Sequence, residues 1–131
     1  MRDLPPLVAE LERQWAAGQW CGSDDLADGL ARFGPAAADA TPVLRRFWEQ
    51  TPHSYERPSY LRALAAIRPG ATGAELTESL WDCEEQSRLF AVEHAPDGPE
   101  LRCRLAELQG SQVESEELWA ATARRLVGGN R

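Results

Sequence analysis

The chain has 131 residues, and its 21 acidic residues outnumber 14 arginines, with no lysine, to give a formal net charge of −7. This length predicts one domain with enough chain for a hydrophobic core. The negative charge argues against a nucleic-acid binder or a protein of anionic membranes, because both partners favour a cationic surface. The abundance of alanine, arginine and proline is typical of the codon usage of a high-GC bacterium.

Cysteines and histidines are few and widely spaced. Cys21, Cys83 and Cys103 form no Cys-x-x-Cys pair, and His53 and His94 form no paired-histidine motif. These spacings predict neither a metal site nor a disulfide framework. No phosphate loop or nucleophile motif indicates a cofactor or an enzyme. The N-terminal residues contain no apolar run long enough for a signal peptide or a membrane span, so reduced thiols in the cytoplasm are expected.

Helical periodicity begins near the N-terminus. Residues 5–18 and 23–33 each repeat apolar side chains every three or four positions, which predicts two helices. Gly34 can adopt the left-handed conformation that ends a helix, and the proline after it fits the first turn of the next. A third helix is expected over residues 35–50. Pro42 inside it removes a backbone hydrogen bond and should bend or restart the helix.

The middle of the chain repeats this pattern. After a connector at residues 51–58, the sequence predicts a helix over 59–68, a Pro-Gly corner, and one long helix over 74–94. A break near Glu85 is the alternative to that long helix. No proline or glycine interrupts the apolar rhythm before residue 96, which favours the continuous form.

Two further helices are expected in the C-terminal third. Residues 99–110 carry leucines at helical spacing, and the last helix should end near residue 127. Ser111 and Glu114 have the spacing of a capping box, which would start that last helix. No segment shows the strict apolar–polar alternation of a strand, so the expected fold class is all-α.

Apolar positions recur at a spacing of 33 to 34 residues. Leu30 and Phe33 correspond to Leu64 and Ile67, and the pair Phe47-Trp48 corresponds to Leu80-Trp81. A third unit fits less well, with Leu118-Trp119 at a different offset. Periods in this range are typical of helical-hairpin solenoids, although a non-repetitive helical bundle would also satisfy the pattern.

The segments 33–44 and 61–67 resemble the turn and helices of HEAT/armadillo-like repeats of bacterial type. The resemblance covers residues 24–83 and, more loosely, 99–127. It implies a short α-solenoid of about three antiparallel hairpins that form a single domain, residues 1–131. Its parts would be a capping helix with linker at 1–22 and hairpins at 23–51, 58–95 and 99–127.

The second helices of such hairpins line the inner surface in the resembled family. Large apolar residues followed by tryptophan recur there, and aromatic and arginine side chains dominate binding hot spots. The candidate partner-binding residues are Arg45, Trp48, Glu78, Trp81, Asp82 and Trp119. The alternative is that the tryptophans fill the space between hairpins, as most apolar helix stripes do.

The expected function is therefore a non-catalytic interaction module for a protein or peptide. No cofactor, metal, nucleic acid or membrane is expected as a partner. The alternative is a small helical-bundle regulator or immunity-type protein that acts by dimerisation or by masking a partner, which leaves a homodimer open.

Overall fold

The structure, a computed structural model, describes residues 4–111 and 113–129. In these ranges the protein is helical and contains no strand, which confirms the all-α prediction. Within the same ranges, each helix is too short or too polar to cross a lipid bilayer. The α-helices are α1 (Leu4–Ala16), α2 (Asp24–Ala31), α3 (Thr41–Gln50), α4 (Arg57–Ile67), α5 (Gly73–Ser79), α6 (Glu85–His94), α7 (Pro99–Gln109) and α8 (Glu116–Gly129). Two 3₁₀ helices, η1 (Gly34–Ala40) and η2 (Ser54–Glu56), connect them.

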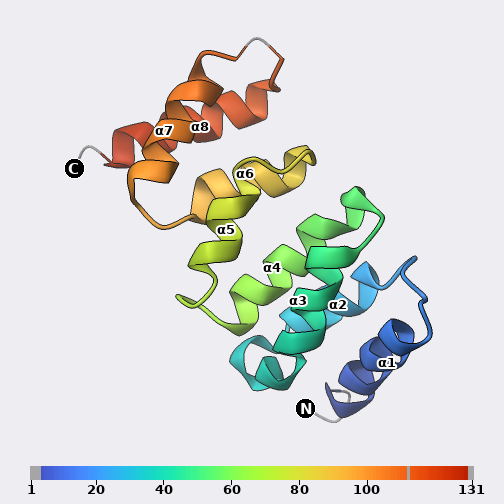
Figure 1. Ribbon diagram of the computed structural model, residues 1–131. Coiled ribbons are helices and arrows are strands. Elements are labelled where there is room, and N and C mark those ends of the chain that lie inside the picture. The colour runs from blue at the N-terminus through green and yellow to red at the C-terminus, as the bar shows by residue number, and fades with distance from the viewer. Residues whose placement is uncertain (1–3, 112, 130–131) are drawn as a thin grey trace. The chain divides into compact units, whose positions relative to one another are not determined.

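The chain divides into two compact units, Met1–Thr72 and Gly73–Arg131. We call them the N-terminal unit and the C-terminal unit. The first holds α1 to α4, drawn blue to green in Figure 1, and the second holds α5 to α8, drawn yellow-green to red.

The predicted corner after α2 is present. Gly34 has φ of +58°, the left-handed conformation that favours glycine, and Pro35 follows in η1. η1 does not run on into a regular helix, because Ala37 leaves helical geometry with φ of −93° and ψ of 20°. α3 then begins at Thr41, with Pro42 in its first turn, where a missing N–H costs nothing. This confirms that the proline restarts the helix.

The N-terminal unit is built around α4. Both α2 and α3 pack on α4 more extensively than they pack on each other, and α1 covers α2. The hairpin expected over residues 23–51 is therefore completed by α4, on which both α2 and α3 pack. The core at this junction is aromatic: the Phe47 ring stacks on Tyr60 at 5.3 Å between centroids and meets the Trp15 ring edge-on at 5.2 Å.

The C-terminal unit corrects the prediction of one helix over 74–94. The helix breaks after Ser79, so segment 58–95 contains three helices in place of two. Backbone N–H groups of Leu80, Trp81 and Asp82 donate to carbonyls three residues earlier, which tightens the end of α5. The Asp82 carboxylate then accepts the N–H of Glu84 at 2.9 Å and draws the backbone out of the helix. The alternative break near Glu85 is confirmed.

α7 and α8 follow the predicted ranges with one correction. α7 ends at Gln109, before Gly110, as expected. The capping box of Ser111 and Glu114 is wrong: α8 begins at Glu116, and Ser115 Oγ accepts the N–H of Leu118 at 3.2 Å. Glu114 is instead committed to an ion pair with Arg88 at 2.8 Å.

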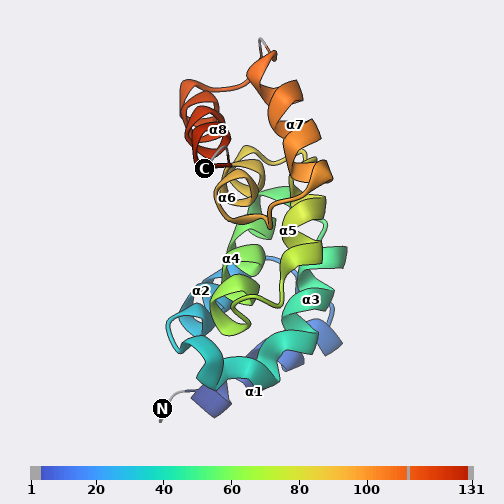
Figure 2. The same ribbon diagram turned by 90° about the vertical axis from the view of Figure 1, so that its left-hand side faces the viewer.

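Both units contain a set of three consecutive helices with the same packing plan. In α2–α3–α4 and in α6–α7–α8, the first and third helices pack against each other and the middle helix packs against the third. Figure 2 shows α6 and α8 adjacent with α7 beside them, and α2 and α4 adjacent with α3 beside them. In the C-terminal unit α5 also packs on α6, as α3 packs on α4 in the N-terminal unit.

Candidate functional site

Trp81 is the more exposed of the two candidate tryptophans in the C-terminal unit. It follows the end of the short helix α5, and 47% of its surface is exposed. The Arg104 guanidinium lies 5.7 Å from the centre of the indole ring and donates through Nε to the Leu80 carbonyl at 2.9 Å. A second contact joins Arg104 to Glu107 at 2.9 Å. Arg104 therefore holds the indole at the surface by a cation–π contact.

The surroundings of Trp81 are acidic. Glu78 is exposed one turn earlier, and Asp82 follows directly and is partly exposed. Glu84 and Glu85 continue the run before the first cation, Arg88. The charge is uneven along the chain: residues 73–131 contain twelve acidic residues and six arginines, whereas residues 1–72 contain nine and eight. Most of the net negative charge thus belongs to the C-terminal unit.

Trp48 lies in the core of the N-terminal unit, with 2% of its surface exposed. The Arg57 guanidinium covers the ring at 5.0 Å and also donates to the Trp48 carbonyl oxygen. Among the described residues, the buried indole Nε1 has no hydrogen-bond partner. Arg45, one turn earlier, is exposed and pairs with Glu49 at 3.6 Å. A partner could touch Arg45 directly, but it could reach Trp48 only by opening the unit.

The six candidate residues therefore separate into groups. Arg45 and Trp48 belong to the N-terminal unit. In the C-terminal unit, Glu78, Trp81 and Asp82 lie together at the end of α5, and Trp119 lies in the second turn of α8 with 36% of its surface exposed. The structure thus brings together three of the six residues, around one exposed indole.

The N-terminal unit also contains a buried carboxyl that sequence reasoning missed. Glu56 has no exposed surface although it lies in the connector before α4. Its Oε1 accepts the Tyr60 hydroxyl at 3.2 Å and the Asp24 N–H at 3.4 Å, while Oε2 has no partner among the described residues. Burial, together with the nearby Asp24 carboxyl, raises the pKa of Glu56 above its usual range. Burial also raises the pKa of Tyr60.

Glu56→Gln is expected to stabilise the protein at neutral pH. Because the folded-state pKa of Glu56 is raised, the folded protein binds this proton more tightly than the unfolded chain does. The stabilisation that comes from protonated Glu56 is complete below the ordinary pKa of 4.5. It is lost as pH rises through the pKa of Glu56 in the folded state. Glutamine retains an acceptor for Tyr60 without a charge. Urea denaturation across this pH range should show a flatter profile for the variant, and an unchanged profile would contradict the assignment.

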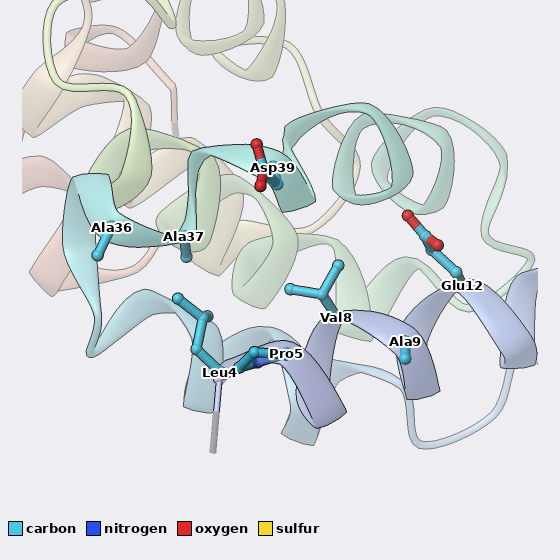
Figure 3. Close-up of a pocket in the computed structure, with 8 residues that line it drawn as sticks. All are labelled: Leu4, Pro5, Val8, Ala9, Glu12, Ala36, Ala37 and Asp39. Atoms are coloured by element: carbon cyan, nitrogen blue, oxygen red, sulfur yellow. The ribbon is translucent and has the colours of Figure 1, made fainter. Parts of the chain in front are cut away.

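A shallow recess of about 290 Å³ lies between α1 and η1. Figure 3 shows Leu4 and Val8 of α1 directed toward η1, with the Glu12 carboxylate on α1 and the Asp39 carboxylate on η1. The remaining lining side chains are small and apolar. The recess therefore offers contact area, and no converging set of polar groups for a reaction.

Cys21 and His53 form a second contact that the sequence did not reveal. The Cys21 Sγ and the His53 Nε2 lie 2.9 Å apart, although 32 residues separate them. His53 lies in the connector over residues 51–58, and no local motif links it to Cys21. Only the packing of the N-terminal unit brings them together.

Comparison of the chain with known protein families, with curated proteins and with solved structures found no match in any of the three.

Proposed function

We propose that this protein is an interaction module built from HEAT/armadillo-like helical hairpins in a short α-solenoid, and that it binds a basic segment of another protein. The repeated packing plan of α2–α3–α4 and α6–α7–α8 supports the hairpin architecture. The exposed, free cysteines support a reducing compartment, the cytoplasm.

The exposed indole of Trp81 carries the proposal. An indole with 47% of its surface exposed offers a large aromatic surface that a partner can bury. Arg104 already covers part of the ring, which shows that its electron-rich face accepts a guanidinium. An arginine of the partner would bind the remaining indole surface in the same way.

The acidic side chains around the ring determine the kind of partner. Glu78 and Asp82 flank Trp81 in the sequence, and the C-terminal unit carries most of the net negative charge. Charge complementarity therefore selects a segment rich in arginine or lysine and speeds its approach. An acidic or purely apolar segment would meet repulsion or find no charge to pair with.

Trp81→Ala is expected to weaken binding of a basic peptide by roughly thirtyfold, which is about 2 kcal/mol for a hot-spot tryptophan. The peptide would come from a random library displayed against the immobilised full chain. Affinity would be measured by titration calorimetry. Selection should enrich peptides with arginine next to apolar residues.

Trp20→Ala is the matched control, because Trp20 is an exposed tryptophan of the N-terminal unit. It should leave the affinity unchanged, whereas Glu78→Gln should weaken binding in low salt more than in high salt. Enrichment of peptides without basic residues, or equal binding by the Trp81 and Trp20 variants, would refute the proposed function. A dimer of the chain that buries Trp81 in solution would also count against it.

A further inference from the structure

The Cys21–His53 pair lies at the surface of the N-terminal unit, whereas Trp81 belongs to the C-terminal unit. Cys21 is exposed in the loop between α1 and α2. Two glycines with positive φ, Gly18 at 70° and Gly22 at 82°, turn the chain on either side of it. His53 precedes η2, and its ring packs against Tyr55 at 5.4 Å between centroids. Two separate connectors therefore present a thiol and an imidazole to each other at 2.9 Å.

This contact suits proton transfer. In the neutral pair the thiol donates its hydrogen to His53 Nε2, and after transfer the imidazolium N–H donates to the thiolate. The thiolate is the nucleophilic form of cysteine, and an adjacent imidazolium stabilises it. A histidine within hydrogen-bond reach is the usual means by which proteins activate a cysteine.

The charged surroundings of the pair are mixed. Tyr55 packs on the His53 ring, and its own charged neighbours include Glu56, Asp24 and Cys21. A thiolate formed at this sulfur would have the imidazolium N–H of His53 as its direct hydrogen-bond partner at 2.9 Å. Partial desolvation, with added repulsion from Glu56, Cys21 and Asp24, raises the pKa of Tyr55, which keeps the phenol neutral beside the pair.

Small molecules can reach the sulfur. A recess of about 380 Å³ opens beside Cys21, and Trp20, with 38% of its surface exposed, forms one of its walls. The other lining residues are Gln14, Gly18 and Gln19. The recess combines an apolar ring with amide groups, which suits a small polar thiol compound rather than a folded protein.

We propose that Cys21 is a thiol-modification site that exchanges with low-molecular-weight disulfides. The Cys21 thiol gives its proton to His53, and the thiolate attacks one sulfur of the disulfide R–S–S–R. A new S–S bond joins Cys21 to one R–S group as the original S–S bond breaks. The leaving thiolate takes the proton from His53 and departs as R–SH, so that one disulfide is consumed and one is formed.

Cys83 and Cys103 provide internal controls, since both are exposed and free like Cys21. Among the described residues, neither thiol has a histidine as a hydrogen-bond partner. The Cys103 thiol faces the Glu107 carboxylate at 3.8 Å, and Cys83 lies between Asp82 and Glu84 in the sequence. A carboxylate repels a thiolate, whereas an imidazolium attracts it.

The test measures exchange at each cysteine of the intact chain. The protein would react briefly with oxidised glutathione at about pH 7, be quenched, and be cleaved after glutamate, which places each cysteine in a separate peptide for mass spectrometry. Cys21 should form the mixed disulfide roughly tenfold faster than Cys103. In denaturant the three rates should converge, because the preference depends on folding.

His53→Asn is the decisive variant, because it removes the base but keeps a polar side chain. It should lower the rate at Cys21 to that of Cys103 and leave Cys83 and Cys103 unchanged. Circular dichroism would establish that the variant folds, and His53→Gln is a second choice if it does not. Equal rates at the three cysteines of the native protein, or a fast Cys21 in the folded His53 variants, would overturn the proposal.

Discussion

Phe47→Ala is expected to lower the free energy of unfolding by about 4 kcal/mol. Phe47 has no exposed surface and contacts both Tyr60 and Trp15 through its ring. The variant loses the transfer energy of a phenyl group, leaves a cavity between α3 and α4, and removes two aromatic contacts. A natural domain is stable by about 5 to 15 kcal/mol, so this single change removes a large part of the total.

Urea denaturation followed by circular dichroism would measure this effect, with tryptophan fluorescence as a second probe. Gln50→Ala is the control, since Gln50 is exposed on the same helix, and it should change the free energy of unfolding by less than about 0.5 kcal/mol. A loss of less than about 1 kcal/mol in the free energy of unfolding of Phe47→Ala would show that the aromatic contacts do not stabilise the N-terminal unit.

Arg88→Ala is expected to lower the free energy of unfolding by about 3 kcal/mol. Arg88 joins three parts of the C-terminal unit: its guanidinium pairs with Glu114 at 2.8 Å and donates to the carbonyls of Asp82 and Cys83 at 2.9 and 3.0 Å. The side chains of Arg88 and Glu114 are only 14% and 10% exposed. Alanine would leave a mostly buried carboxylate without its cation and two carbonyls without a donor.

Arg88→Lys should lower the free energy of unfolding by about half as much, because an ammonium keeps the charge but cannot reach all three acceptors. The control is Arg102→Ala. Arg102 pairs with Asp97, and both side chains are about two-thirds exposed, at 64% and 66%; exposed pairs contribute no more than about 1 kcal/mol. Denaturation of the three variants would test this ranking, and equal stabilities for Arg88→Ala and Arg102→Ala would contradict it.

The correction in residues 74–94 shows where the sequence signal is ambiguous. Apolar residues continue at helical spacing across the break, so periodicity alone predicts one helix. What ends α5 is a local competition, in which the Asp82 carboxylate takes the Glu84 N–H from the helix. Aspartate has this capacity at any position, and tertiary packing decides where it is used.

Trp48 and Trp81 show the same limit for the candidate site. Each follows a large apolar residue at a repeated position, yet Trp48 is buried under Arg57 and Trp81 is exposed beside Arg104. The pattern locates the tryptophans on their helices. It cannot state whether a neighbouring helix covers them, because that depends on residues far away in the sequence.

The sequence by itself determined the helical class, the glycine-proline corner at residue 34, an interruption of regular helix at Pro42 and the end of α7 at Gly110. These features depend on backbone geometry and on hydrogen bonds within a few residues, so local residue types suffice to specify them. Only the tertiary structure decided the burial of Glu56, the Cys21–His53 contact and the exposure of Trp81. Each of these depends on segments that come together when the apolar faces of distant helices are buried away from water. A short stretch of sequence does not determine which segments will be in contact.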